Sequence, residues 1–260
     1  MDTLFKYPRT QHLEGSGLQA NDDPVTLPFR MLAGQTLTVE EKVDGANCGI
    51  SFEAPGQLRL QSRGHYLNGG PRERQFELLK SWAARYSAEL WELLGTRYRM
   101  FGEWLYAKHT VFYTDLPHYF LEYDIYDHET QRFLDTEQRR ALLHKAPFIV
   151  SVPVLSQQSF SSMPELLALL GPSTMIAADH REQLAAQAEA HGQPIAQILA
   201  ETDPSGWMEG LYIKVERNGS VLERYKYVRS GFLQTVVDSG SHWMDRPLLP
   251  NRLRKGVTLW

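Results

Sequence analysis

The sequence predicts an α+β fold in which mainly antiparallel sheets are flanked by helices. Two pairs of strand-like runs are each joined by a short turn, "APGQ" at residues 54–57 and Asn218-Gly219, as expected for β-hairpins. Helical and strand-like runs are mixed along the chain, and the hairpins are prominent. This mixture favours antiparallel sheets with helices beside them over a doubly wound parallel sheet.

The first third of the chain contains three short strand-like runs followed by one helical run. The strands are predicted at Thr36–Glu41, Asn47–Phe52 and Gln57–Ser62. A helix is predicted from Pro71 to about Leu94, because apolar side chains recur there every three or four residues. Pro71 suits a first helical turn, and Gly95 suits the end of a helix.

The rest of the chain continues this mixture. Two strands are predicted at Arg97–Leu105 and Tyr119–Tyr126, and "FIVSVPVL" at residues 148–155 is a further strand-like run. A short helix is expected at about Thr136–Lys145, and the Ala- and Leu-rich stretch Met163–Ala200 is expected to be helical, with breaks at "GPS" and "GQP". The last hairpin consists of Leu211–Arg217 and Ser220–Val228.

Composition restricts the class of protein. The chain has 260 residues, a net charge of −4 and 42% hydrophobic residues, which is typical of an ordinary globular protein. It is no bulk polycation, so any polyanion would be bound by a local basic patch. No run approaches the ~20 apolar residues of a membrane span, and residues 1–10 contain no apolar signal core. Cys48 is the only cysteine. We therefore expect a cytoplasmic protein without a membrane partner.

One lysine has a setting that suits a nucleophile. In "EKVDGAN", Lys42 lies between an acid and a Val-Asp-Gly turn at the start of a strand. A free lysine has a pKa near ~10.4 and is therefore protonated and a poor nucleophile at neutral pH. Arg63, Lys226 and a divalent cation brought near Lys42 would lower this pKa and stabilise a phosphate under attack. Gly45 allows a close turn, in which Asp44 is expected to hydrogen-bond locally.

Five further motifs follow Lys-x-Asp-Gly along the chain. They are "QSRG" with Arg63, "FGEWL" with Glu103, "YFLEYD", "MEGLYIK" with Glu209 and "ERYKYV" with Lys226. In this order, over residues 39–228, the series resembles that of the covalent nucleotidyltransferases, which include ATP-dependent ligases and mRNA capping guanylyltransferases. "EKVDGAN" with its Asn47 resembles the phage RNA ligase 2 group. The segment "KYPRTQHLEGS" is similar to the leader of bacterial RNA-ligase-family proteins.

The resemblance implies a nucleotidyltransferase (ATP-grasp-like) domain and a role for each matched residue. Lys42 would take the AMP, Arg63 and Lys226 would contact phosphate, and Glu103 would hold the ribose. Glu209 would lie at the metal and the α-phosphate, with Glu103 as the other metal ligand. The implied cofactors are ATP and Mg²⁺ (or Mn²⁺).

Three further site residues follow from the same resemblance. Glu41 would lie beside the adenine, and Asn47 would support the strand-sealing step. An aromatic residue of "YFLEYD" would stack on the adenine, and we expect this to be Tyr123 rather than Phe120.

The last hairpin departs from the family pattern. Arg224-x-Lys226 stands where the family usually has Lys-x-Lys. A two-residue turn would pair Leu211 with Lys226 and Ile213 with Arg224, so that Lys214 points to the opposite face unless a bulge intervenes. Both Lys214 and Arg224 are retained as predicted ATP-binding residues.

These observations predict an ATP-dependent RNA ligase that joins 5′-phosphate and 3′-hydroxyl ends through lysyl-AMP and RNA-adenylate. A minimal ATP-dependent DNA ligase is one alternative, and a nucleotide- or RNA-binding module without catalysis is another. The expected partners are RNA strand ends and a separate end-healing kinase or phosphatase. We expect one domain over residues 1–260, with a helical insertion at about 156–203 and a C-terminal tail at 229–260. This tail is too short for an OB domain, so "NRLRKG" at residues 251–256 is expected to assist RNA contact.

Overall fold

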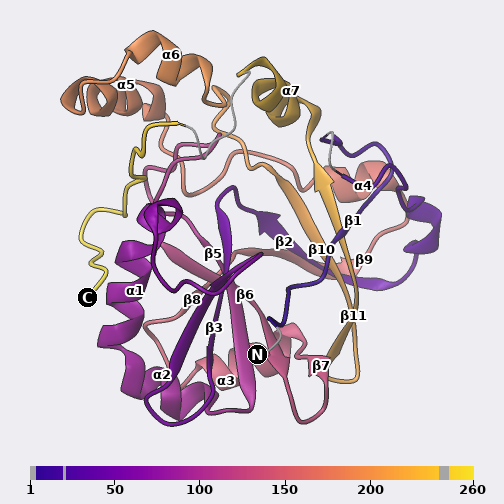
Figure 1. The fold of residues 1–260 in the computed structure, drawn as a ribbon. Coiled ribbons are helices and arrows are strands. Elements are labelled where there is room, and N and C mark those ends of the chain that lie inside the picture. Colours follow the sequence, from indigo (N-terminus) through magenta and orange to yellow (C-terminus); the bar gives the residue numbers. More distant parts are fainter. Residues whose placement is uncertain (1–3, 20–21, 240–245) are drawn as a thin grey trace.

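Two mainly antiparallel sheets occupy the centre of the molecule, as Figure 1 shows. The computed structural model describes residues 4–19, 22–239 and 246–260. The predicted α+β fold is confirmed, and no closed barrel occurs in this described part of the chain. Within the same residues, no helix combines the length and apolar character needed to span a bilayer.

The first sheet has the strand order β1-β11-β10-β2-β9. Its strands are β1 Gln11–His12, β11 Ser220–Val228, β10 Gly210–Arg217, β2 Thr36–Lys42 and β9 Val154–Ser159. Neighbouring strands are antiparallel except for β1, which runs parallel to β11. The sheet therefore places the final hairpin directly beside the strand that ends at Lys42.

The second sheet has the order β4-β3-β5-β6-β7, with β8 parallel to β6. Its strands are β3 Ala46–Phe52, β4 Leu58–Ser62, β5 Tyr98–Trp104, β6 Phe120–Asp127, β7 Arg132–Phe133 and β8 Val150–Ser151. Only residues 43–45 separate β2 from β3, so this turn carries the chain from one sheet to the other. A Cβ at Gly45 would lie 2.7 Å from the carbonyl oxygen of Trp104, so the close approach at the turn requires glycine.

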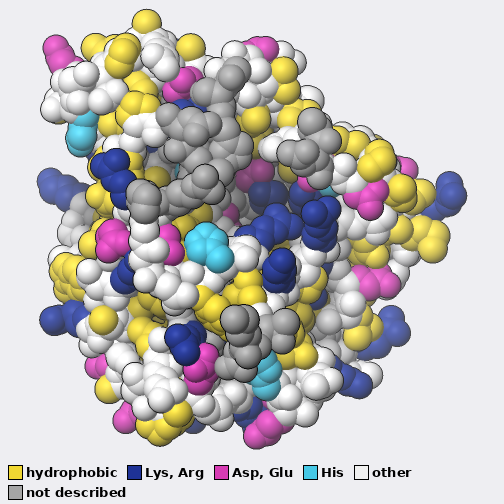
Figure 2. All heavy atoms as spheres, in the orientation of Figure 1, with side chains coloured by type: hydrophobic (Ala, Val, Ile, Leu, Met, Phe, Trp, Pro, Cys, Tyr) yellow, Lys and Arg dark blue, Asp and Glu magenta, His cyan; other side chains and the backbone are white. Residues whose placement is uncertain are grey.

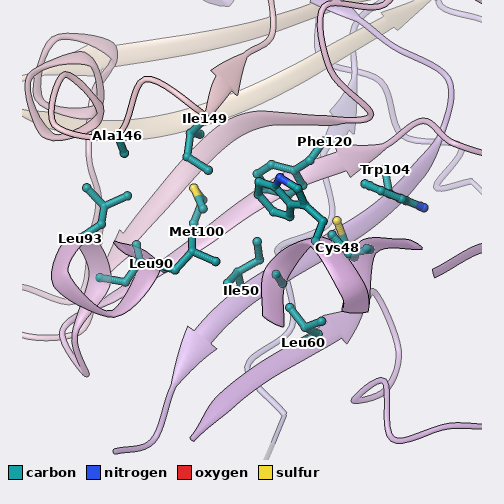
Figure 3. Close-up of a cluster of buried hydrophobic side chains, with 14 of the residues drawn as sticks. Cys48, Ile50, Leu60, Leu90, Leu93, Met100, Trp104, Phe120, Ala146 and Ile149 are labelled. Carbon is teal, nitrogen blue, oxygen red and sulfur yellow. The ribbon is translucent and has the colours of Figure 1, made fainter. Parts of the chain in front are cut away.

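Two helices, α1 Glu77–Arg85 and α2 Ser87–Leu94, pack against the second sheet. Figure 3 shows the resulting core, in which Leu90 and Leu93 of α2 lie with Ile50 and Met100 of the sheet. These side chains are at most 8% exposed. Burial of this apolar surface fixes the sheet from which several site residues project.

The helix predicted as continuous from Pro71 to about Leu94 is divided. Residues Pro71–Phe76 form a 3₁₀ helix (η2), and α1 and α2 are separated at Tyr86. The backbone of Tyr86 leaves helical geometry, and its ring stacks on Phe148 at 4.6 Å. The Tyr86 N–H donates to the Trp82 carbonyl, and the Leu90 N–H donates to the Tyr86 carbonyl. These hydrogen bonds bridge the break, which explains why the apolar spacing continues across it.

The run "FIVSVPVL" is divided between the two sheets rather than forming one strand. It contributes β8 to the second sheet and the start of β9 to the first. Pro153 lies between them, and because proline has no N–H it interrupts a strand ladder. The Pro153 carbonyl nevertheless accepts a hydrogen bond of 2.9 Å from the Glu41 N–H, which anchors the end of β2.

The remaining helices lie around the sheets (Figure 1). In the segment expected as a helical insertion, residues up to Ser159 extend β9, and three helices follow: α4 Met163–Leu167, α5 His180–Ala190 and α6 Ile195–Ala200. The predicted short helix is α3 Thr136–Leu143. The tail at 229–260 begins with α7 Ser230–Asp238.

The final hairpin forms as predicted, but its predicted residue pairs are wrong. Asn218 and Gly219 have φ values of 52° and 78°, as a tight hairpin turn requires. A bulge between Val215 and Glu216 then shifts the register by one residue. Tyr212 therefore lies opposite Lys226, and Lys214 opposite Arg224. The bulge brings Lys214 to the same face as Arg224 and Lys226.

Candidate active site

A cavity of about 150 Å³ takes its lining from both sheets. Seven predicted site residues reach it from five strands and the segment after β4: Glu41, Lys42, Asn47, Arg63, Glu103, Tyr123 and Lys226. Glu209 does not line the cavity, but its carboxylate lies 2.6 Å from Nζ of Lys42. Eight residues from separate parts of the chain, between Glu41 and Lys226, are thus collected around one small space.

The contact between Lys42 and Glu209 follows from the register of β2 and β10. Lys42 is the last residue of β2 and pairs with Gly210, the first residue of β10, so Glu209 lies immediately before the pair. Gly210 is required there, because an added Cβ would overlap the carbonyl oxygen of Tyr227 on β11. The Lys42 side chain remains 23% exposed, so its amine is accessible from the cavity.

The charges near Lys42 act against the expectation of a lowered pKa. Burial, the largest single influence, lowers the pKa of Lys42, but the carboxylates of Glu209 and Glu103 together outweigh it and raise the pKa above its ordinary value. The expected lowering by the cations Arg63 and Lys226 is thus outweighed by these two acids. Lys42 in this site is therefore an ammonium group that must lose a proton before it can act as a nucleophile.

Three glutamates of the site have raised pKa values. Burial raises the pKa of Glu103 to about 8, with Lys42 opposing and Glu209 adding to the effect. Burial raises the pKa of Glu209 to about 7 against the influence of Lys42. Burial likewise raises the pKa of Glu41 to about 7, against a hydrogen bond with Ser173. These carboxyl groups are held out of water without enough cations to balance them.

The donor set fits a partly coordinated divalent cation. Oε1 of Glu41 is buried without a hydrogen-bond partner among the described residues, and the negative charges of Glu103 and Glu209 influence one another. No group of three or more His, Cys, Asp or Glu side chains suited to a metal ion occurs in the described ranges. Mg²⁺ commonly takes one or two protein carboxylates and completes its shell with water and substrate phosphates. Glu103 and Glu209 fit that pattern.

A bulge in the second sheet directs Tyr123 into the cavity. In the register of β5 and β6, Phe101 lies opposite Asp124 and Gly102 opposite Glu122, so Tyr123 is the extra residue. Its side chain lines the cavity, whereas Phe120 is fully buried and stacks on Trp82 in the core of Figure 3.

Asn47 lies beside Tyr123 and Glu103. It pairs with Glu103 across β3 and β5, and its Nδ2 donates a hydrogen bond to the Tyr123 hydroxyl. Its Oδ1 is buried and has no hydrogen-bond partner within the described residues. The amide is thus held by the tyrosine, and an acceptor oxygen remains available to a bound group.

Lys214 and Arg224 lie outside the cavity lining, in a buried network between the sheets. Nζ of Lys214 is 2.8 Å from Glu40 and 3.2 Å from Asp124. Nε of Arg224 is 2.8 Å from Asp124, and Arg139 also joins this network. Burial would raise the pKa of Asp124, but Arg224, Lys214 and Arg139 together hold it well below its ordinary range. The two basic residues are therefore already paired with acids.

Asp44 holds a distant loop rather than its own turn. Its carboxylate accepts hydrogen bonds of 2.7 Å from the backbone N–H groups of Thr110 and Val111, and its own N–H donates to the hydroxyl of Tyr113. The expectation of a local hydrogen bond within the turn is not what the structure shows. Asp44 instead fixes the turn after Lys42 against the segment that follows β5.

Sequence reasoning missed several residues of the cavity. Tyr7, Pro8 and Thr10 of the N-terminal segment and Tyr212 of β10 also line it. The hydroxyl of Tyr212 lies 2.7 Å from that of Tyr7 and 3.0 Å from that of Thr10. The segment "KYPRTQHLEGS" was recognised as a leader, but no local pattern indicated that its side chains would form a wall of the site.

Basic side chains gather near the centre of one face of the molecule, as Figure 2 shows. Arg63 and Lys226 line the cavity, and Arg9 lies in an adjoining hollow. In the tail segment "NRLRKG", Asn251 is buried and hydrogen-bonded to the Leu105 carbonyl, whereas Arg254 is exposed.

Comparison with known proteins gives one family and one fold. The model of the family described as RNA ligase matches residues 35–228. No curated protein matches the sequence. An apo variant of a Naegleria gruberi RNA ligase superposes with a TM-score of 0.52 at 15% identity, covering 81% of this chain and 54% of that chain. Another variant of that enzyme, with AMP and Mn, gives a TM-score of 0.53 at 15% identity and covers 91% and 65%.

These two matches establish a shared fold. The chain spans between half and two thirds of the length of the solved structures that it matches. The matched segment 35–228 includes all eight residues that gather around the cavity, whereas Tyr7, Pro8 and Thr10 lie before it.

Proposed function

The chain belongs to the RNA ligase family, and on that premise we propose that it is an ATP-dependent RNA ligase that joins 5′-phosphate to 3′-hydroxyl ends. One observation carries the proposal: Nζ of Lys42 lies 2.6 Å from Glu209 and opens into a cavity lined by Glu103, Arg63 and Lys226. A nucleophile, acids and phosphate-binding cations are thus assembled in one space. The Naegleria relative carries AMP and Mn in a solved structure, which supports the choice of nucleotide.

The first chemical step is attack of Lys42 on the α-phosphate of ATP. A bond forms between Nζ and the α-phosphorus, and the bond from this phosphorus to the bridging oxygen of pyrophosphate breaks. One ammonium proton must leave before attack. Glu209 is the carboxylate nearest to this ammonium group, and a cation bound at Glu209 would favour loss of the proton to solvent by offsetting the negative charge that holds it.

The other cavity residues bind the nucleotide and its charge. Tyr123 stacks on the adenine, Glu41 lies beside the base and Glu103 binds the ribose. Arg63 and Lys226 bind phosphate oxygens and stabilise the negative charge of the transition state. A Mg²⁺ or Mn²⁺ ion held by Glu103 and Glu209 would offset the acids that now raise the pKa of Lys42.

Two transfers complete the reaction. An oxygen of the RNA 5′-phosphate attacks the phosphorus of lysyl-AMP, and the bond from phosphorus to Lys42 breaks. The 3′-hydroxyl then attacks the activated 5′-phosphorus, and AMP leaves as the strand is sealed. We assign Asn47 to this last step and Lys214 and Arg224 to support of the site from behind the cavity.

Formation of the covalent adduct tests the proposal directly. The protein should become labelled by ATP carrying a radioactive α-phosphate in the presence of Mg²⁺ or Mn²⁺, and GTP should label it poorly. Lys42→Ala should abolish the label, whereas Lys145→Ala, which removes an exposed lysine, should not. Thermal melting would show that Lys42→Ala remains folded. Wild-type labelling of Lys42→Ala would place the nucleophile elsewhere.

Two alternatives have distinct outcomes. A minimal DNA ligase would seal nicked all-DNA duplexes as well as nicks with RNA ends, and a binding module without catalysis would bind ATP and form no adduct.

The cellular location and the partners of the protein belong to the same proposal. We propose a cytoplasmic RNA-repair role in which an end-healing kinase or phosphatase supplies the 5′-phosphate and 3′-hydroxyl ends. The single cysteine supports a reducing compartment.

A further inference from the structure

A second hollow adjoins the nucleotide cavity. It has a volume of about 620 Å³ and shares Thr10, Arg63 and Lys226 with the lining of that cavity, so the two spaces adjoin. Gln11, Gln19 and Asp23 also line it, as do Arg9, His12 and Asp22 of the same N-terminal segment. These N-terminal residues precede the segment 35–228 that matches the family, and none of them has a role in the proposed reaction.

The N-terminal segment is fixed to the strand that carries Lys226. In the parallel pair of β1 and β11, His12 lies opposite Lys226. The Leu13 N–H donates to the Lys226 carbonyl at 2.9 Å, and the Val228 N–H donates to the Ser16 hydroxyl at 2.9 Å. This backbone register brings the imidazole and the lysine to the same hollow.

His12 is a buried polar group whose two ring nitrogens face Ser16 and Asp22. The residue is 2% exposed, and its Nδ1 lies 2.6 Å from the Ser16 hydroxyl. Its Nε2 is buried and has no hydrogen-bond partner among the residues that the structure describes. Such a nitrogen is costly unless a ligand satisfies it, and here it faces Asp22 at 3.2 Å.

Asp22 places one carboxylate between two nitrogen groups. Its Oδ1 is 3.1 Å from Nζ of Lys226, and its Oδ2 is 3.2 Å from Nε2 of His12. A carboxylate and a phosphate both present anionic oxygens to such nitrogen donors, and a charged lysine binds phosphate well. Asp22 therefore occupies the position of an anion between a lysine and a histidine.

We propose that this hollow is a phosphate-binding subsite built by His12 of the N-terminal segment with Lys226 and Arg63, in which Asp22 is an internal anion that an incoming phosphate displaces. The identity of the phosphate rests on the proposed function. It is either the terminal phosphates of ATP or the 5′-phosphate of the RNA end, and both require the same chemistry.

Direct binding to the full chain tests the subsite without any need for ligase activity. Calorimetry would measure inorganic pyrophosphate in one arm, and 5′-phosphorylated against 5′-hydroxyl oligoribonucleotide in the other. Asp22→Asn should bind the phosphate ligand about five- to tenfold more tightly, because one competing charge is removed. Glu14→Gln removes one charge from an exposed position of the same segment and should bind as the wild type does.

A second variant probes the histidine. His12→Ala should weaken binding of the same ligand about five- to tenfold, and His12→Gln should weaken it less because the amide can still donate. If either variant melts below the wild type, the comparison of Asp22→Asn with Glu14→Gln decides alone. Unchanged affinity of Asp22→Asn for both pyrophosphate and the phosphorylated strand would overturn the subsite.

The two arms also identify the source of the phosphate. A gain in Asp22→Asn that is confined to pyrophosphate assigns the subsite to ATP, and a gain confined to the 5′-phosphorylated strand assigns it to the RNA end. If the wild type forms no AMP adduct but Asp22→Asn still binds the phosphate ligand more tightly, the proposed ligase activity is refuted and the proposed subsite is kept. If the wild type forms the adduct but Asp22→Asn binds the phosphate ligand no more tightly, the ligase activity is kept and the subsite is refuted.

Discussion

At the scale of single residues, the unusual feature is one lysine held among acids that lack sufficient positive partners. Glu103 and Glu209 raise the pKa of Lys42, and their own pKa values are raised by burial. Near neutral pH, protons therefore compete with any bound cation for the carboxylates of Glu103 and Glu209. The reactivity of Lys42 depends on removing those protons rather than on the lysine alone.

This coupling predicts how cation binding depends on pH. We expect Mn²⁺ to bind more tightly as the pH rises from about 6 to about 8, because protons leave Glu209 near 7 and Glu103 near 8. Calorimetry in buffers of different ionisation enthalpy should detect the released protons. Glu103→Gln should remove the upper part of the pH dependence, and Glu137→Gln, at an exposed position, should not.

The same shifts determine the direction of a stability effect. Carboxyl groups whose folded pKa exceeds the unfolded value of ~4.3 bind more protons in the folded state, so their contribution to the free energy of unfolding falls as the pH rises from about 4 to about 8. For the cation-binding prediction above, an affinity for Mn²⁺ that stays constant from pH 6 to 8 would show that Glu103 and Glu209 are not the cation ligands.

Asn47 allows the steps of the reaction to be separated. Asn47→Ala should still form lysyl-AMP but should join strands more slowly, with a loss of ~2–4 kcal/mol of barrier stabilisation, as for one removed polar group. Its Nδ2 bonds the Tyr123 hydroxyl, so Tyr123→Phe is the matched control that removes this hydrogen bond and keeps the ring. Single-turnover joining of pre-adenylylated RNA is the measurement. Equal joining rates for Asn47→Ala and wild type would leave Asn47 as a structural residue of β3.

At the scale of elements, strand register positions the site. Lys42 pairs with Gly210, and Glu209 reaches the lysine only because β10 begins at that pair. Two bulges adjust the side-chain alternation: one directs Tyr123 into the cavity, and the other turns Lys214 towards the buried network. A one-residue slip in any of these strands would send its side chains to the wrong face.

Gly210→Ala tests this dependence on register. The new Cβ would overlap the Tyr227 carbonyl oxygen and lie 2.9 Å from its carbonyl carbon, and neither atom can move without breaking the ladder to β11. We expect a loss of about 2–3 kcal/mol of stability, as for an overpacked core, together with loss of the AMP adduct. Gly171→Ala adds a Cβ where no atom lies within 4 Å and should change neither. Chemical denaturation would measure both, and a fully stable Gly210→Ala would show that the strands can separate there.

At the scale of the whole molecule, a buried charge network connects the two sheets behind the cavity. Arg139 of α3 is 1% exposed and lies 3.2 Å from Glu40 of β2 and 3.2 Å from Glu122 of β6. Lys214 of β10 adds contacts to Glu40 and Asp124. Because Glu40 also lines the nucleotide cavity, this network fixes the sheets relative to each other at the site itself.

Arg139→Met should therefore be severely destabilising. It leaves buried carboxylates without their main partner, which costs about 3–5 kcal/mol. The neighbouring Arg140→Met removes an exposed arginine of the same helix and should have little effect. The deficit should shrink as the pH falls towards about 5, because the unpaired acids can then take up protons. Urea unfolding at two pH values would measure this, and a deficit independent of pH would locate the loss in packing rather than charge.

Most of the long strands, the final hairpin and the position of Lys42 could be predicted from the sequence alone. These depend on short-range rules: alternating apolar residues for strands, Asn218-Gly219 for a tight turn, and a lysine beside a Val-Asp-Gly turn. The order of the motifs then indicated the family, which the match over residues 35–228 confirms. The errors in the predicted fold were the undivided helix after Pro71, the single strand at "FIVSVPVL" and the residue pairs of the final hairpin.

Other features depend on residues that are distant in the sequence, so they became visible only in the folded chain. The bulges at Tyr123 and after Val215 arise where strands must fit two packed sheets, so no local pattern locates them. The direction of the Lys42 pKa shift depends on Glu103 and Glu209, which reach the lysine only after folding. The wall formed by the N-terminal segment likewise exists only because β1 pairs with β11, at the opposite end of the chain. Local propensity specifies elements, whereas electrostatics and register depend on which elements meet.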